Sequence, residues 1–226
     1  MHQAHNFEVS FQDGASVVDQ LVAKDGSEAH PHVQALMAAA VDPVAQPLPL
    51  LADAAHYLGL LHGQFPAVMD YAATHITDNA ARRWLIAACD AFAQERAYIA
   101  RLSVELGPVP GTPGHHNSDA MVLQLRHAVE MLAQSERYGC ALGAATTLAI
   151  DWIAIRRLLD HAAIRTGLEP VQSTLPGKAE TLHVLRHLDT TGLTLRAIRF
   201  GGRQLLHQHN SLWSMLDSRA ETRAGL

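Results

Sequence analysis

The chain is poor in aromatic residues, which make up only 5% of its 226 residues. A core with so few large rings must be built mainly from alanine and leucine, and that favours closely packed helices over a β-sandwich. Charged residues are also sparse at 17%, against 48% hydrophobic residues. This balance excludes a disordered chain and is typical of a globular protein. At this length we expect one large domain with a sizeable core.

Cysteine is scarce as well, because only Cys89 and Cys140 occur and neither belongs to a CxxC pattern. A disulfide framework and a zinc ribbon are therefore not indicated. The N-terminus lacks a basic segment followed by an apolar one, and the longest low-charge stretch, 139–150, is too short to span a bilayer. We therefore expect a cytoplasmic protein with no signal peptide and no membrane partner.

The chain lacks the basic excess of a nucleic-acid-binding protein, since its net charge is -5 and no lysine or arginine cluster offsets it. Nucleic acid is therefore not an expected partner. The loop 107–117 is rich in glycine and proline but does not end in the GK[ST] of a phosphate-binding loop. The sequence also has no GxSxG nucleophile motif and no CxxCH haem attachment motif.

What the chain does have is a repeated irregularity in its helical hydrophobic pattern. Four stripes of apolar residues each contain one ionisable residue where an apolar one is expected: His62, Glu95, Glu136 and Asp151. Because a helix packs such a stripe into the core, one histidine and three carboxylates are predicted to point inward. Burying an unpaired charge is costly, so these groups must pair with each other, with arginine or with a metal, or take up protons.

The same periodicity predicts an all-α fold. We expect an N-terminal arm and short helices over 1–48, a four-helix-bundle core over 49–167, and C-terminal helices over 168–226 packed on the bundle, all within one domain. Residues 1–14 read as a short strand or an ordered arm, and they precede short helices near 15–24 and 31–41.

Helix boundaries follow from local signals. Gly63 and Pro66 predict a kink or break just after His62. Thr77 or Asp78 is expected to cap the second bundle helix, which ends at Leu106 before Gly107-Pro108.

The next helix is expected to be capped by Asn117 or Ser118. An unbroken helix from there would be too long, so we expect a break between Arg137 and Thr147, with Gly139 and Gly143 otherwise allowing two helices to approach closely. Two further helices are expected over 176–189 and 194–218, covering the end of the bundle or forming a dimer surface.

Oxygen and imidazole ligands from facing helices are how helical bundles hold iron or manganese. On this architecture and its inward carboxylates, residues 49–167 resemble the ferritin-like class of bundles, and less closely the haem-oxygenase-like class. The resemblance implies a metal site at His62, Glu95, Glu136 and Asp151, an iron or manganese cofactor and redox activity. It carries no family motif, since the Glu-x-x-His of ferritin-like di-iron sites is absent after Glu95 and Glu136.

The alternative is a metal-free helical scaffold or ligand-binding protein. In that case the carboxylates are neutralised in buried ion pairs by Arg96, Arg137, Arg156 or Arg157, which fix the helix register. A homodimer and a small-molecule ligand are compatible with both readings, and whether the protein is an enzyme stays open. The one Glu-x-x-His in the chain, at Glu180 and His183, is best read as a solvated helix face.

Overall fold

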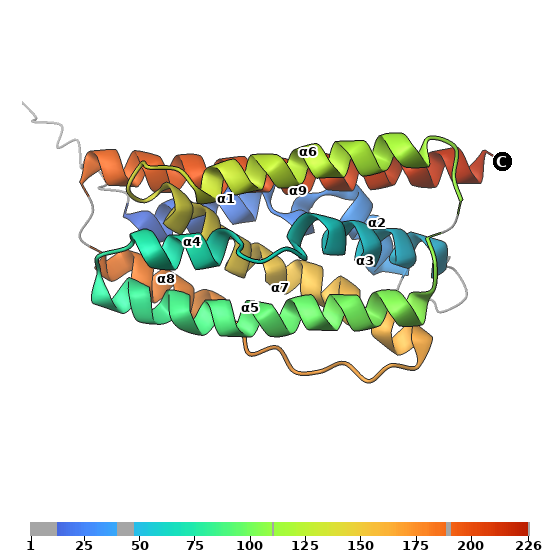
Figure 1. The fold of residues 1–226 in the computed structure, drawn as a ribbon, viewed down its shortest axis with the longest axis horizontal. Helices are drawn as coiled ribbons and strands as arrows, with labels where there is room; N and C mark the ends of the chain where they lie inside the picture. The colour runs from blue at the N-terminus through green and yellow to red at the C-terminus, as the bar shows by residue number, and fades with distance from the viewer. Residues whose placement is uncertain (1–12, 40–47, 110, 189–190, 226) are drawn as a thin grey trace, which may run out of the picture.

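The computed structural model describes residues 13–39, 48–109, 111–188 and 191–225. These ranges are helical and contain no strand, which confirms the predicted all-α fold. The elements are α1 (Gly14–Asp25), η1 (Ser27–Ala29), α2 (Pro31–Ala39), α3 (Leu48–His62), α4 (Val68–His75), α5 (Asn79–Leu106), α6 (His115–Ala133), α7 (Cys140–Thr166), α8 (Lys178–His187) and α9 (Gly192–Ala224). Figure 1 shows an elongated bundle whose long helices run along one axis.

Helices α3 and α4 follow one another along the bundle axis, and the break between them lies near the middle of its length (Figure 1). The predicted break after His62 is confirmed, because α3 ends at that residue. Pro66 lies in the connection, where it cannot continue the α3 hydrogen-bond pattern. The pair α1 and α2 is interrupted in a similar way by the 3₁₀ turn η1. The bundle therefore has two interrupted helix pairs, α1 with α2 and α3 with α4.

The bounds of α5 agree with the capping signals. The Asp78 carboxylate accepts a hydrogen bond from the Ala81 N–H at 2.8 Å, and Gly107 follows the helix with a φ of 79°. Helix α6 begins at His115, before either predicted cap residue, because Gly114 with a φ of 80° ends the preceding turn.

The break after α6 comes earlier than predicted. Helix α6 ends at Ala133 and α7 begins at Cys140, so the predicted range of 137–147 overlaps only the end of the connection. Gly139, with a φ of 96°, precedes α7, whereas Gly143 lies inside that helix. A side chain at φ near +96° is strained, so Gly139 is the residue that permits the turn.

Helices α7 and α9 approach backbone to backbone through glycines. A Cβ atom added at Gly143 would collide with the Ile198 carbonyl oxygen, and one added at Gly201 would collide with the Cys140 carbonyl oxygen. The predicted close approach at Gly143 is therefore confirmed, and α9 is the partner.

Helix α9 lies along α6 and α7 rather than over the end of the bundle (Figure 1). It is longer than the predicted 194–218, and its buried stripe includes Leu205, His209 and Leu212. No described helix is both long enough and apolar enough to cross a membrane. The predicted arm at residues 1–14 lies almost entirely outside the described residues.

Candidate functional site

His62 is the last residue of α3, and only 4% of its surface is exposed. Its Nε2 atom lies 2.9 Å from Nε2 of His209, in the middle of α9, and the two rings are nearly perpendicular at 88°. A hydrogen bond between two ring nitrogens requires one to donate and the other to accept. The two histidines therefore share one proton position between them.

The second ring nitrogen of His209 continues the hydrogen-bonded series. Nδ1 lies 2.6 Å from Oδ2 of Asp151 on α7, and both side chains are 1% exposed. Ser27 donates to the same carboxylate twice, from its backbone N–H to Oδ1 and from its hydroxyl to Oδ2, each at 2.6 Å. The Trp213 indole N–H donates to the Ser27 hydroxyl oxygen at 2.9 Å. We call His62, His209, Asp151 and Ser27 the histidine chain.

Local backbone geometry explains how Ser27 reaches Asp151. The 3₁₀ turn leaves the Ser27 N–H free of helical bonding, and this donor points across to α7. A Cβ atom at the preceding Gly26 would collide with the Val22 carbonyl oxygen and would lie 2.9 Å from Asp151 Oδ1. Glycine at position 26 therefore lets the turn approach the buried carboxylate.

With Asp151 ionised and His209 neutral, the hydrogen bonds set the order of protons along the chain. An ionised Asp151 carboxylate only accepts, so Nδ1 of His209 carries a proton, and a neutral His209 then accepts at Nε2 from His62. Nδ1 of this neutral His62 is then left with a lone pair. Burial, the positive charge that His209 can carry and the nearby Arg96 hold the pKa of His62 well below its usual value.

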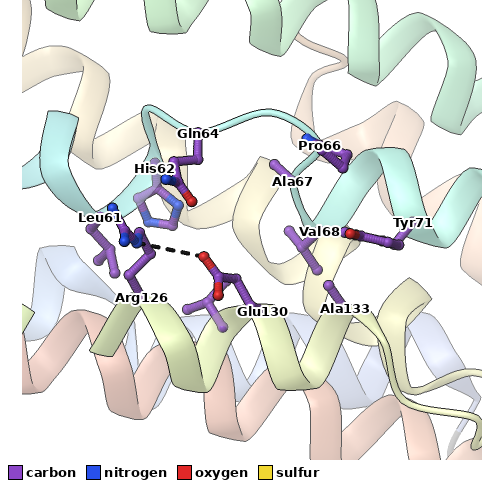
Figure 2. A pocket seen from close by; sticks show the side chains of 11 residues that line it. Leu61, His62, Gln64, Pro66, Ala67, Val68, Tyr71, Arg126, Glu130 and Ala133 are labelled. Atoms are coloured by element: carbon purple, nitrogen blue, oxygen red, sulfur yellow. Dashed lines mark ion pairs between the residues drawn. The ribbon is translucent and has the colours of Figure 1, made fainter. Parts of the chain in front are cut away.

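His62 lines a small pocket of about 20 Å³, room for about one water molecule, between the α3–α4 connection and α6. Figure 2 shows His62 and Gln64 toward one end of this pocket and Tyr71 toward the other. Arg126 and Glu130 of α6 face each other beside it, with Nε and Oε1 3.5 Å apart (Figure 2). The Arg126 Nε is buried and has no hydrogen-bond partner among the described residues. The pocket is therefore lined by a buried histidine and by an arginine with an unsatisfied N–H donor.

Glu95 belongs to a different network. Arg156 NH1 lies 2.7 and 2.9 Å from the two carboxylate oxygens, Ser173 donates to Oε1 at 2.6 Å, and the Trp152 indole donates to Oε2 at 3.0 Å. Arg156 also bonds Asp160 at 2.8 Å and the Val171 carbonyl oxygen. This arrangement is the buried ion pair of the alternative prediction, and Arg156 was one of its expected partners.

A third buried carboxylate, Asp53, was not predicted. It accepts hydrogen bonds from Arg219 at 3.2 and 3.3 Å and from Arg223 at 2.8 Å, both in the last turns of α9. Arg219 also bonds Ser118 at 3.1 Å, at the N-terminal part of α6. This cluster fixes the C-terminal end of α9 against α3 and α6.

The four predicted metal ligands do not converge. His62 and Asp151 are joined only through His209, and Glu95 is paired with Arg156. Among the described residues, no group of three or more histidine, cysteine, aspartate or glutamate side chains is arranged to hold a metal ion. The carboxylate oxygens of Asp151 and Glu95 already accept protein hydrogen bonds, so they do not fit a metal centre in this arrangement.

Glu136 is exposed in the connection between α6 and α7, and its predicted burial is wrong. The apolar stripe seemed to continue through Glu136 to Gly139, but α6 ends at Ala133 and the following residues leave the helix.

His209 was not among the four candidate site residues, although the sequence shows it as the ionisable residue in the apolar stripe of the last helix. It interrupts the stripe of α9 in the way that His62 interrupts that of α3, so the same criterion identifies it. Ser27 gave no signal, because its backbone N–H contributes as much as its side chain.

Comparison with known proteins identifies a family. A family model described as a family of unknown function (DUF6975) matches residues 22–224, so the chain belongs to this family. The matched range contains the whole histidine chain and the pocket. No curated protein and no solved structure matches the chain.

Proposed function

We propose that this protein performs acid–base chemistry on a water molecule or on a small group of a ligand that reaches into the His62 pocket. The observation that supports this most directly is the unbroken series of hydrogen bonds from His62, at the pocket, to the buried Asp151. A histidine oriented by a second group that is itself oriented by a carboxylate is the arrangement from which general bases are built.

The chain has a defined route for one proton. Nδ1 of His62 accepts a proton from the ligand while Nε2 of His62 passes its own proton to Nε2 of His209. The positive charge then lies on His209, 2.6 Å from the Asp151 carboxylate, which stabilises it. The reverse transfer returns the proton to the ligand. His62 thus acts as a base without keeping the positive charge that its burial disfavours.

The lining of the pocket limits the kind of ligand. Leu61, Val68 and Val129 provide apolar walls, and the adjacent Arg126 and Glu130 have opposite charges. A water molecule or a small, uncharged ligand group with a hydrogen-bond acceptor suits this lining, because the buried Arg126 Nε needs an acceptor and the two charges offset each other.

An activated ester, p-nitrophenyl acetate, tests the proposal by the release of p-nitrophenolate. We expect the wild-type protein to accelerate hydrolysis and His62→Gln to lose roughly tenfold or more of that rate, given the usual size of general-base effects. His116→Gln is the matched control, because His116 is exposed and outside the chain. Equal rates for His62→Gln and wild type, with both proteins folded by circular dichroism, would overturn the proposal.

A non-enzymatic scaffold is the second candidate, and the Glu95–Arg156 pair favours it because a guanidinium held by several acceptors has a structural role. Under this reading no variant of the histidine chain changes ester hydrolysis. The implied iron or manganese site is tested by melting temperature with and without Fe(II) or Mn(II). The homodimer and the cytoplasmic location remain predictions of the sequence.

A further inference from the structure

A second hollow of the protein lies beside the N-terminal part of α9. The connection between α6 and α7 and the first turns of α9 line a groove with a volume of about 780 Å³. Its lining includes four exposed arginines and two aromatic residues: Arg137, Arg196, Arg199, Arg203, Tyr138 and Phe200. No acidic residue of the described chain lines it.

The arginines of this groove differ from those inside the bundle. Arg156 and Arg219 are each paired with buried carboxylates, whereas Arg137, Arg196 and Arg203 form no salt bridge within the described ranges of the chain. Residues 191–216 contain no aspartate or glutamate. The groove is therefore a local concentration of positive charge on a chain whose net charge is -5.

The spacing of these residues produces the cluster. Arg196, Arg199 and Arg203 are three and four residues apart and so lie on one face of α9. Arg137 joins them from the α6–α7 connection, with its guanidinium carbon 5.7 Å from the centre of the Phe200 ring. Three of the four arginines lie within residues 196–203, so the expectation that the chain has no arginine cluster is wrong for this face of α9.

Two exposed aromatic side chains complete the groove. Tyr138 is 42% exposed and Phe200 is 38% exposed, so both rings offer surface to a ligand. Aromatic faces and guanidinium planes both stack on flat rings, and arginine recognises phosphate through paired hydrogen bonds. The groove therefore presents phosphate-binding and ring-binding groups together.

We propose that this groove binds a small phosphorylated ligand with an aromatic ring, of the nucleoside polyphosphate class. Its arginines pair with the phosphates, and Phe200 and Tyr138 contact the ring. A small ligand is favoured over a long nucleic acid because the net negative charge of the chain repels an extended polyanion beyond the groove. A concave site also fits a small molecule better than a flat bilayer surface. The inference is independent of the histidine chain.

Isothermal titration calorimetry with ATP, in the absence of divalent cations, tests this binding. Pyrophosphate and adenosine, titrated separately, test the phosphate half and the ring half of the ligand. We expect saturable ATP binding that weakens as salt rises, weaker pyrophosphate binding and the weakest binding for adenosine. Phe200→Ala should weaken ATP more than pyrophosphate, because only ATP has a ring.

The charge requirement is tested with the double variant Arg196→Gln/Arg203→Gln. We expect ATP affinity to fall roughly tenfold or more, the usual size of losing charged hydrogen bonds. The control is Arg82→Gln/Arg101→Gln, which removes the same charge from exposed positions on α5 and should change ATP affinity little.

Three outcomes would overturn the proposal. These are the absence of ATP binding, an equal loss of affinity in the α5 control, and tighter arginine-dependent binding of a single-stranded oligonucleotide or of phosphatidylserine vesicles than of ATP. The last outcome would assign the same groove to a nucleic acid or a membrane surface instead.

Discussion

Glu95 and Asp151 are both carboxylates with 1% of their surface exposed, yet the bundle satisfies them in opposite ways. Glu95 faces the guanidinium of Arg156, which stays charged at any ordinary pH. Asp151 faces His209, which is charged only when it holds a second proton. The first pair has a fixed charge, and the second can change its charge without leaving the core.

The two carboxylates also differ in which part of the protein their hydrogen-bond networks reach. The Glu95 network reaches Ser173 and Val171 in the segment between α7 and α8, so it holds an exposed connection against the bundle. The Asp151 network instead ends at the pocket beside His62. Two features therefore separate a structural carboxylate from a chemical one in this bundle. These are the charge of its partner side chain and whether its hydrogen-bond network ends at a connection or at a pocket.

The largest expected effect is the loss of the Glu95 charge. Glu95→Gln leaves the buried Arg156 without its main counterion, and removing one partner of a buried pair costs about 3 to 5 kcal/mol. The free energy of unfolding in urea measures this, with Glu105→Gln, an exposed position on the same helix, as the control. A loss below about 1 kcal/mol would remove the distinction between the networks.

Asp151→Asn should cost less, at about 1 to 3 kcal/mol, because it leaves no permanent cation unpaired. The side-chain oxygen of the asparagine can still accept a hydrogen bond. Its NH₂ group, however, faces an N–H of Ser27 or of His209, so two donors lie opposite each other and one bond is lost. Urea unfolding under the same conditions gives the comparison. A loss equal to or above that of Glu95→Gln would show that His209 is a fixed cation, contrary to the proposed proton chain.

A change of helix spacing should act on one network and spare the other. Gly143→Ala pushes α9 away from α7, and overpacking of this kind costs about 1 to 3 kcal/mol. The His209–Asp151 bond joins these two helices, whereas Glu95 and Arg156 join α5 and α7. Histidine side-chain NMR signals should therefore move while the Trp152 indole N–H signal stays. Gly192→Ala, at an open position, is the control, and equal changes in both signals would contradict the separation.

Much of this fold was predictable because its signals are local. The Asp78 cap and Gly107 mark the ends of α5, and Gly63 with Pro66 marks the break after His62. The start of α7 was harder to place, because Gly139 and Gly143 are equal candidates in sequence and only the backbone shows which has positive φ.

The candidate site was predictable only in part. A single ionisable residue in an apolar stripe identified His62, Glu95 and Asp151 as buried. An apolar stripe does not indicate which helices become neighbours. It therefore did not show that Asp151 pairs with His209 whereas Glu95 pairs with Arg156. It also misplaced Glu136, because apolar periodicity continues past the residue where the helix ends.

The smallest expected effect is a dependence of stability on pH that comes from the buried His62. In the unfolded chain a histidine takes up a proton below a pKa near 6.5, whereas the pKa of His62 in the folded protein lies well below that value. The unfolded state therefore binds more protons, and stability falls as pH drops from about 7 toward 5, by at most about 2 kcal/mol for one histidine. His62→Gln should show a shallower fall and the exposed His116→Gln the wild-type fall, both measured by urea unfolding at each pH. Identical slopes for wild type and His62→Gln would mean that His62 takes up its proton in the folded core, so the chain would not transfer the charge toward Asp151.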